Sequence, residues 1–324
     1  MRRRDLIVGL CARVAWPLPA GAQPKTIPVV GMLRPTPRAA DLMEKALRGN
    51  MAALGWQDGR TVAYQFVFTE GDSSRLQELA AELVGTRPAV LVGSGYSSLR
   101  ALQDRTRTIP IVGILADDFV GQGLASSMAR PGGNVTGVSI LGTQLEAKRL
   151  ELLREAVPSA QRIGVILDPA IPVSRERWQV INEMAQALGA HLQVIEAGTT
   201  QELARVLEGM GRTDLDAVNV LSSPFLTAAR GQLIAGLAKA RLPAIYQWAD
   251  TAQEGALLAY GPSLAEAYNR LAVMIDKILR GASPADLPIE QATRIRLVIN
   301  LNTAKALGLT IPPTLLARAD EVIE

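Results

Sequence analysis

The stretch "IPIVGILAD" (residues 109–117) aligns without gaps to "LPAIYQWAD" (residues 242–250). Each is an apolar run that is typical of a buried strand, followed by a small residue and an aspartate. Two further pairs precede it in the same order: "PAVLVGSGYSSLRAL" resembles "DAVNVLSSPFLTAAR", and "VAYQFVFTEGDSSRLQELAAEL" resembles "LQVIEAGTTQELARVLEGM". The sequence therefore indicates one strand–helix arrangement that is used twice.

Strand-like apolar runs alternate with helical periodicity from Ile27 onward. We expect strands at residues 27–33, 61–68, 89–93, 109–115, 162–168, 191–197, 216–222 and 243–248. Alternating strands and helices form parallel sheets through right-handed crossover connections. The expected fold class is α/β, with two doubly wound parallel-sheet lobes and a cleft between them.

The C-terminal part of the chain is too short to form a third lobe, so it must pack on the first two. We expect three crossover segments between the lobes, near residues 139–143, 260–263 and 293–298. This organisation assigns residues 27–140 plus 261–292 to lobe I and residues 141–260 plus 293–324 to lobe II.

Residues 1–22 have the pattern of a secretory signal peptide. Three arginines at residues 2–4 precede a short apolar run, and Ala20-Gly21-Ala22 offers a cleavage site before Gln23. The segment Arg3-Arg4-Asp5-Leu6-Ile7 is similar to a twin-arginine export motif. We expect export to the periplasm, and the alternative is a cytoplasmic protein that keeps this N-terminus.

Cleavage at that point changes the charge and the cysteine content. Of 34 basic and 31 acidic residues, four arginines and Asp5 lie within residues 1–22, so the mature chain has equal numbers of each. A neutral chain offers no electrostatic case for nucleic acid binding. The only cysteine, Cys11, is also removed, which excludes disulfides, Cys-ligated metals and a Cys nucleophile. Because every long apolar stretch contains charges or prolines, we expect no membrane-spanning helix.

The glycines of "RPGGNVTGVS" (130–139) resemble a phosphate-binding loop, but they lead into a strand and not into a helix N-terminus. No Gly-Lys-Ser/Thr triplet occurs in the chain. We expect Gly132 and Gly133 to turn the chain before an edge strand over residues 135–140. Gly137 is expected to allow close backbone packing near the first crossover.

The segment "VLVGSGYSS" (90–98) allows two interpretations. Gly93-x-Gly95 between a strand and a helix partly matches a dinucleotide-binding fingerprint, with Ser98 in place of the last glycine. Alternatively, the unused N–H groups of the helix N-terminus bind a ligand carboxylate. His191 opens a strand, where a surface role is expected, and no hydrolase motif is present. We predict no catalytic residue, no metal and no cofactor.

Polar and aromatic residues lie at the ends of the expected strands. Asp117 and Asp118 follow a strand, where they could hold an ammonium group or a metal, or cap the next helix. Trp248 and Tyr96 also follow strands in a chain with only 4% aromatic residues. They could form walls of a cleft for an apolar ligand, or each could pack under its own loop.

Four segments resemble a known family. "RPGGNVTGVS", "AKRLELLREAVPSAQRIGV", "GALLAYGPSLAEAY" and "LVINLNTAKALGLTIPPTLLARADEVI" are similar to ABC-transporter substrate-binding proteins of the type often labelled tryptophan/tyrosine-binding. The resemblance covers essentially the whole mature chain. It implies a type I periplasmic binding protein fold, closed around a small ligand by a hinge. It also implies partner subunits, a membrane permease and an ATPase, that carry out transport.

Two segments depart from the family pattern. "DPAIPVS" (168–174) stands where an Asn-Pro-Asn-like loop is usual, so the ligand contacts of lobe II can differ. Tyr96 stands where small residues are common, and it could stack on the ligand or narrow the cleft.

We therefore expect a monomeric, non-enzymatic receptor for an aromatic or apolar amino acid or a related small carboxylate. Its expected ligand-binding residues are Ser94, Gly95, Tyr96, Ser97, Asp117, Asp168, Ser174 and Trp248. The residues at 94–97 receive the carboxylate, Asp117 pairs with an ammonium group, and Trp248 and Tyr96 cover the apolar part. Asp168 and Ser174 contribute from lobe II. The alternatives are a cytoplasmic nucleotide-dependent enzyme that uses Gly93-Ser94-Gly95, or the ligand-sensing domain of a regulatory system.

Overall fold

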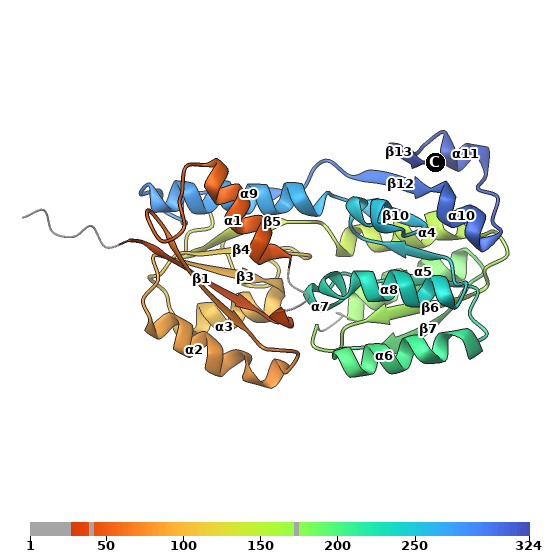
Figure 1. The fold of residues 1–324 in the computed structure, drawn as a ribbon, viewed down its shortest axis with the longest axis horizontal. Helices are drawn as coiled ribbons and strands as arrows, with labels where there is room; N and C mark the ends of the chain where they lie inside the picture. The colour runs from red at the N-terminus through yellow and green to blue at the C-terminus, as the bar shows by residue number, and fades with distance from the viewer. Residues whose placement is uncertain (1–26, 39–41, 172–174) are drawn as a thin grey trace, which may run out of the picture.

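The computed structural model describes residues 27–324 except 39–41 and 172–174. Within these residues the strands form one six-stranded and one seven-stranded sheet, each covered by helices on both faces. We define lobe I as the six-stranded sheet with its helices and lobe II as the seven-stranded sheet with its helices. The two lobes lie end to end along the longest axis of the molecule (Figure 1).

The sheet of lobe I is built mainly from the N-terminal half of the chain. Its strands are β1 (Val29–Arg34), β2 (Ala63–Phe68), β3 (Val90–Ser94), β4 (Ile111–Leu115), β5 (Val135–Ser139) and β11 (Glu290–Gln291). Its helices are α1 (Met43–Ala53), α2 (Leu76–Gly85), α3 (Gly95–Arg105) and α9 (Leu264–Leu279). Helices α1 and α9 bury their apolar stripes on one face of this sheet, and α2 and α3 bury theirs on the other.

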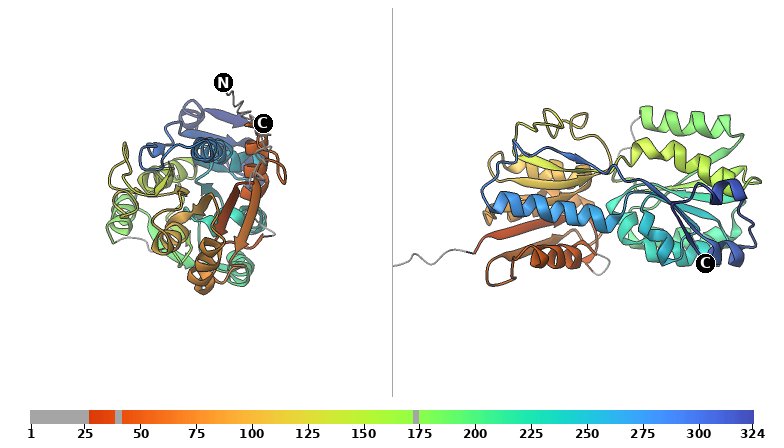
Figure 2. Two further views of the ribbon diagram at one scale, coloured as in Figure 1. Left: turned by 90° about the vertical axis from the view of Figure 1, so that its left-hand side faces the viewer. Right: turned by 90° about the horizontal axis from the view of Figure 1, so that it is seen from above.

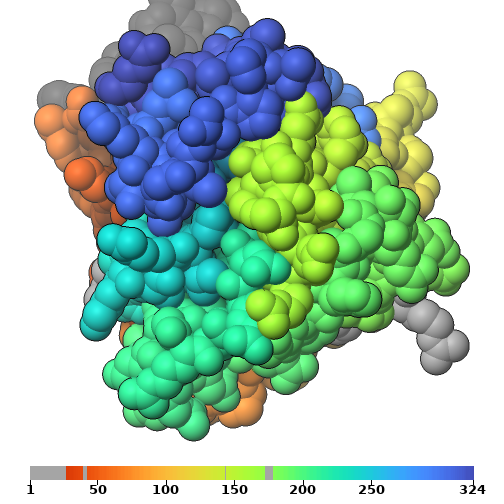
Figure 3. All heavy atoms as spheres, turned by 90° about the vertical axis from the view of Figure 1, so that its right-hand side faces the viewer, coloured from red at the N-terminus to blue at the C-terminus, as the bar shows by residue number. Residues whose placement is uncertain are grey.

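Lobe II contains the remaining strands and helices. Its strands are β6 (Arg162–Leu167), β7 (His191–Glu196), β8 (Ala217–Val220), β9 (Ala244–Tyr246), β10 (Leu258–Gly261), β12 (Arg296–Asn300) and β13 (Glu321–Ile323). Its helices are α4 (Glu146–Ala156), α5 (Arg175–Ala187), α6 (Thr200–Gly209), α7 (Pro224–Ala228), α8 (Arg230–Lys239), α10 (Leu301–Leu307) and α11 (Pro313–Leu316). The C-terminal segment, blue in Figure 3, lies beside α4, and Arg318 forms an ion pair of 2.8 Å with Glu155 there.

The two sheets repeat one strand order. Five strands of lobe I run β5-β4-β3-β1-β2, and five strands of lobe II run β10-β9-β8-β6-β7, which is the same order when each set is numbered from its first strand. The strands β4 and β9, which arise from the two aligned stretches at 109–117 and 242–250, occupy equivalent places. The expected duplication is thereby confirmed. All eight predicted strands are present, each within two residues of the predicted bounds.

The chain passes between the sheets three times in the described residues. The passages follow β5, separate β10 from α9, and separate β11 from β12. They coincide with the crossover segments predicted near residues 139–143, 260–263 and 293–298. Figure 2 shows α9 extending from the junction of the lobes along lobe I.

Two features of the sheets differ from the prediction. Strand β12 runs antiparallel to β10, because the chain enters β12 at Arg296, which lies opposite the end of β10 at Gly261. Strand β5 was expected at the edge of its sheet, and this is wrong because β11 pairs with its outer side at Val138 and Ser139. A two-residue strand such as β11 is too short to produce a periodic sequence signal.

No helix in the described part of the chain is long and apolar enough to cross a membrane. The predicted signal peptide, residues 1–22, lies outside the described residues.

Gly137 in β5 packs against the neighbouring strand as expected. A Cβ atom at this position would lie 2.1 Å from the carbonyl oxygen of Gly113 in β4. No side-chain rotation can relieve a clash between a Cβ atom and a backbone carbonyl, so the two strands would have to separate.

We predict that Gly137→Ala lowers the free energy of unfolding by about 1–3 kcal/mol, the usual cost of overpacking. Urea denaturation of the variant measures this loss. Gly133→Ala is the matched control, because a Cβ atom there meets nothing within 4 Å, and its change should stay within about 0.5 kcal/mol. Equal stabilities of the two variants would contradict the packing at Gly137.

Candidate functional site

A cleft lies between the lobes at the carboxyl ends of the parallel strands of both sheets. Ligands bind at this edge in open α/β sheets, because loops and helix N-termini converge there. The cleft contains two adjoining cavities. We call the one beside Trp248 the first chamber and the one beside Asp168 the second chamber; their empty volumes are about 560 Å³ and 760 Å³.

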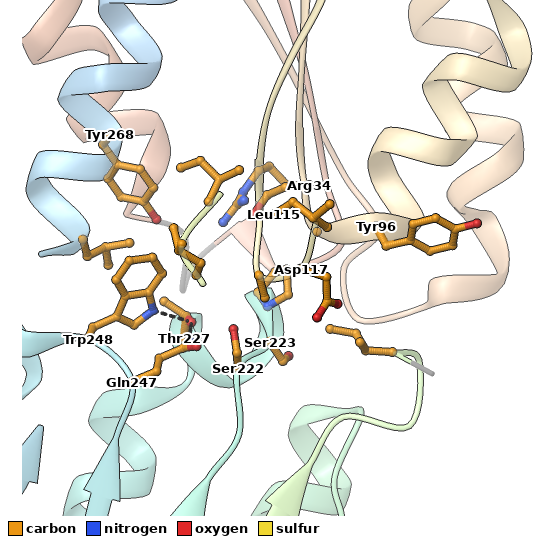
Figure 4. A pocket seen from close by; sticks show the side chains of 18 residues that line it. Arg34, Tyr96, Leu115, Asp117, Ser222, Ser223, Thr227, Gln247, Trp248 and Tyr268 are labelled. Carbon is orange, nitrogen blue, oxygen red and sulfur yellow. Dashed lines mark hydrogen bonds between the residues drawn. The ribbon is translucent and has the colours of Figure 1, made fainter. Parts of the chain in front are cut away.

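The first chamber has walls from both lobes. It is lined by Arg34, Ser94, Gly95, Tyr96, Ile114, Leu115, Ala116, Asp117, Ile140, Ile171, Ser222, Ser223, Pro224, Thr227, Gln247, Trp248, Leu264 and Tyr268 (Figure 4). Lobe I contributes the ends of β1, β3, β4 and β5 together with α9. Lobe II contributes the loop from β8 to α7 and the end of β9.

Trp248 and Tyr268 form the apolar side of the first chamber (Figure 4). Both are buried and pack with the core of lobe I on the α9 face of the sheet. The indole of Trp248 is held in place because its Nε1 donates a hydrogen bond of 3.0 Å to Thr227 Oγ1. Gln247 Nε2 donates to the same oxygen at 2.9 Å. The hydroxyl of Thr227 thus fixes two neighbouring side chains of the wall.

The first chamber also contains opposite charges. Arg34 is 3% exposed and is the last residue of the buried strand β1, and Asp117 follows β4. Figure 4 shows the guanidinium of Arg34 in the space between Tyr268 and Asp117. A buried guanidinium binds carboxylates strongly, because charge-assisted hydrogen bonds gain strength away from water. The chamber therefore presents a cationic group, an anionic group and an aromatic surface.

The N-terminus of α3 lines both chambers. Ser94 is its N-cap residue, and no side chain caps the helix there. The N–H groups of the first turn have no acceptor within the helix, so they can bind an anion. Gly95 has a φ of +77°, and a Cβ atom there would lie 2.9 Å from Pro224 Cγ of lobe II. Glycine is therefore needed at this position both for its conformation and for the contact between the lobes.

The second chamber is more polar. Asp168 and Ser97 line it, and neither lines the first chamber. Asp168 accepts hydrogen bonds from Ser223 Oγ at 2.8 Å and from the N–H of Ala170 at 2.9 Å. Burial raises the pKa of the Asp168 carboxyl above its ordinary value, and the two hydrogen bonds oppose this shift in part. Ser97 Oγ donates a hydrogen bond of 3.4 Å across the cleft to the carbonyl of Ala170.

The structure thus divides the predicted site residues. Asp117 and Trp248 lie in the first chamber, Ser97 and Asp168 in the second, and Ser94, Gly95 and Tyr96 line both. Ser174 lies outside the described residues. Asp118 is turned elsewhere, because its carboxylate accepts hydrogen bonds from the N–H groups of Val120 and Gly121. The described residues between Asp118 and β5 form no helix, so the predicted cap of a next helix is wrong for it, and its carboxylate closes the turn at Val120 and Gly121 instead.

Tyr96 does not face Trp248. Its ring points away from Trp248 and Tyr268 in Figure 4 and packs, half-buried, on the core formed by α2 and α3. Tyr268 occupies the place beside Trp248 instead.

Only five of the residues that line the first chamber were predicted from the sequence, and the most important of the others are Tyr268 and Arg34. Tyr268 fits the apolar periodicity of α9 and packs in the core beneath it, and nothing in that periodicity distinguishes a cleft residue from a core residue. Arg34 is the first charged residue after the apolar run of β1, at the end of that strand, and this position was the available signal for it.

Comparisons with known proteins agree on one family. A family model described as "ABC transporter substrate binding protein" matches residues 37–323. A tyrosine-binding protein of Clostridioides difficile is 26% identical over 279 residues, which cover 82% of this chain and 77% of that protein.

Two solved structures have the same fold with TM-scores of 0.77. One is an ABC domain from Streptococcus pneumonia in complex with L-Trp, 24% identical, and the other is a conserved domain protein from Vibrio cholerae, 27% identical. Both matches cover 92% of this chain and 100% of the other chain.

The raised pKa of Asp168 predicts a pH-dependent stability. Between the ordinary pKa of 3.8 and the raised pKa, the folded protein binds more protons at this carboxyl than the unfolded chain does. The contribution of Asp168 to the free energy of unfolding is therefore largest below pH 3.8 and is lost as the pH rises through the raised pKa.

Urea denaturation of the wild type and of Asp168→Asn from pH 3.5 to 7.5 tests this. We expect the stability of the wild type to fall relative to the variant as the pH rises, and then to stay constant. A difference that grows in favour of the wild type would show that the carboxylate is stabilised in the fold, contrary to its burial.

Proposed function

Because this chain belongs to the family of ABC transporter substrate binding proteins, we propose that it is the exported receptor of an ABC importer. In this proposal it binds an aromatic or apolar amino acid, or a related small carboxylate, in the first chamber. A permease and an ATPase subunit carry out transport, and this chain binds the ligand as a monomer without transforming it.

The observation that carries the ligand class is the combination of groups in the first chamber. A guanidinium and a carboxylate, Arg34 and Asp117, line the same space as the aromatic side chains of Trp248 and Tyr268. An α-amino acid carries a carboxylate, an ammonium group and a side chain on one carbon atom, so it matches all three. The ligands named for the C. difficile relative and the S. pneumonia structure, tyrosine and L-Trp, support the same class.

We assign the ligand carboxylate to Arg34 and the N-terminus of α3, including Ser94, which line one chamber. The ammonium group then pairs with Asp117, and the apolar part lies against Trp248 and Tyr268. Asp168 and Ser97, in the second chamber, hold polar atoms of a longer ligand or the water that adjoins it. Closure of the lobes removes water from these contacts, which strengthens them.

Closure is a movement of one lobe toward the other around the bound ligand. The contacts of Gly95 with Pro224 and of Ser97 with Ala170 already join the lobes across the cleft. A ligand that touches both lobes favours this closed arrangement by its higher affinity for it.

We predict that Asp117→Ala and Trp248→Ala each weaken binding of the responding amino acid at least about tenfold, which is 1.4 kcal/mol. A thermal-shift screen of the chain from Gln23 against amino acids, small acids, sugars and nucleosides finds the ligand, and calorimetry measures the affinity. Asp118→Ala is the matched control, because that carboxylate holds only its own turn.

Unchanged affinity in both pocket variants would refute the assignment of the site. A response to sugars or nucleosides, with none to any amino acid, would refute the ligand class.

Export is tested separately by the N-terminus of the protein made in bacteria. We predict a periplasmic chain that begins at Gln23, because the Ala20-Gly21-Ala22 segment precedes that residue. A full-length chain in the cytoplasm would contradict the receptor function.

A further inference from the structure

The crossover segments are held by charged side chains of lobe II, of which one is buried. Arg149 of α4 is fully buried, and its guanidinium donates hydrogen bonds to the carbonyl of Gly142 at 2.6 Å and to that of Tyr260 at 3.1 Å. Gly142 belongs to the first crossover, and Tyr260 lies at the end of β10, just before the second. One side chain of lobe II therefore binds the first two connections between the lobes.

The charge of Arg149 is neutralised within its own helix. Glu146, one turn earlier and 1% exposed, lies 2.9 Å from the Nη2 atom of Arg149. Breaking a buried ion pair costs several kcal/mol, whereas an apolar replacement of both partners is often tolerated. An apolar replacement here would leave the carbonyls of Gly142 and Tyr260 without their donor, so the ion pair is needed to hold these two carbonyls.

A second charged group, the carboxylate of Asp250, binds the end of the second connection and the end of the third. Asp250 Oδ2 accepts hydrogen bonds from the N–H groups of Leu264 at 2.7 Å and Ala265 at 3.2 Å, and from Ser263 Oγ at 3.0 Å. These residues form the N-terminus of α9, where a negative charge is favourable. Asp250 Oδ1 lies 3.2 Å from Nη2 of Arg296, the first residue of β12 after the third crossover.

The first crossover contains a strained residue between the two lobes. Leu141 has a φ of +53°, a left-handed conformation that is unfavourable for a residue with a side chain. The N–H groups on either side of it, those of Ile140 and Gly142, donate to the carbonyls of Leu115 and Ala116 in lobe I. The carbonyl of Gly142 is held by Arg149 of lobe II. The chain therefore passes from one lobe to the other within two residues.

We infer that Arg149 and Asp250 are positioning residues that fix all three crossovers to lobe II and thereby set the angle between the lobes. Neither residue lines the first or the second chamber. When lobe I moves relative to lobe II, the backbone changes therefore occur on the lobe I side of Arg149 and Asp250, which we call the two anchors. The effect of these two residues on ligand affinity rests on the proposed receptor function, whereas their effect on the angle between the lobes does not depend on a ligand.

The position of Asp250 supports this division of roles. In the aligned stretches 109–117 and 242–250, Asp250 corresponds to Asp117. Asp117 faces the first chamber from lobe I, whereas the equivalent aspartate of lobe II binds the N-terminus of α9. The same place in the repeated unit therefore contributes to the cleft in one lobe and to the hinge in the other.

The distance between the lobes can be measured directly. A chain that starts at Gln23 contains no cysteine, because Cys11 is the only one in the sequence. Glu78→Cys in α2 and Gln201→Cys in α6 place spin labels on exposed positions of the two lobes. Double electron–electron resonance then gives the distribution of label distances without ligand and with L-tryptophan as the probe.

We expect Asp250→Ala to broaden and shift the ligand-free distribution and to change the apparent Kd for L-tryptophan about fivefold or more. Asp250→Asn should have a smaller effect, because an amide oxygen can still accept from Leu264 N–H. Arg149→Lys should resemble Asp250→Ala, and if that variant fails to fold, the two Asp250 variants decide the test. Glu155→Gln, which removes an ion pair on the same helix away from the crossovers, is the control and should match the wild type.

Identical distance distributions for Asp250→Ala and the wild type would overturn the inference. If L-tryptophan does not bind the wild type, the ligand class of the proposed function fails for that probe, while the ligand-free distributions still test the anchors.

Discussion

Three connections must leave one sheet and enter the other, and their backbone groups cannot be satisfied by strand pairing on the way. Buried carbonyls without donors are costly. A guanidinium offers five N–H donors in a fixed plane, so a single buried arginine can serve several carbonyls at once. Arg149 does this for Gly142 and Tyr260, and Glu146 provides the opposite charge that makes its burial tolerable. The relative position of the two sheets, and hence the shape of the cleft, depends on this small set of contacts.

The duplicated strand–helix unit explains why a cleft exists at all. Each lobe brings the carboxyl ends of its parallel strands, with their loops and helix N-termini, to one edge. With the same strand order in both sheets, the two edges face each other across the crossovers. Equivalent positions of the two lobes carry different side chains, and these differences give the cleft its chemical groups. Leu115 and Trp248 correspond in the aligned stretches and both line the first chamber, but only the lobe II copy provides an aromatic ring.

Much of this architecture could be predicted from the sequence, because the signals are local. Buried parallel strands are continuous apolar runs, and helices repeat their apolar residues every three to four positions, so the eight predicted strands and the crossovers lie where expected. The direction of β12 and the pairing of β11 with β5 depend on contacts between segments about 40 and 150 residues apart, and no local pattern reports them.

The site was predictable to a lesser extent. Trp248 and Asp117 follow strands that end at the cleft, and this position identified them. Tyr268 satisfies the apolar period of α9 while also facing the chamber, so a core role and a cleft role look the same in the sequence. For Tyr96 the sequence suggested a cleft residue, because it lies at the N-terminus of α3, but its ring packs on the core of lobe I. Side-chain direction at a helix start depends on tertiary packing, which residue spacing does not encode.

If an amino acid binds against Trp248 between the lobes, as we propose, the indole N–H of this residue reports on the binding directly. In a ¹⁵N-labelled chain from Gln23, tryptophan occurs at positions 56, 178 and 248, and Trp248→Phe identifies the signal of the last. Titration with L-tyrosine or L-phenylalanine, which carry no indole, should shift the Nε1–H resonance of Trp248, because its donor lies at the chamber wall beside Thr227. The resonance of Trp56 should stay in place. A ligand from this class that binds without moving the Trp248 signal would contradict binding against this side chain.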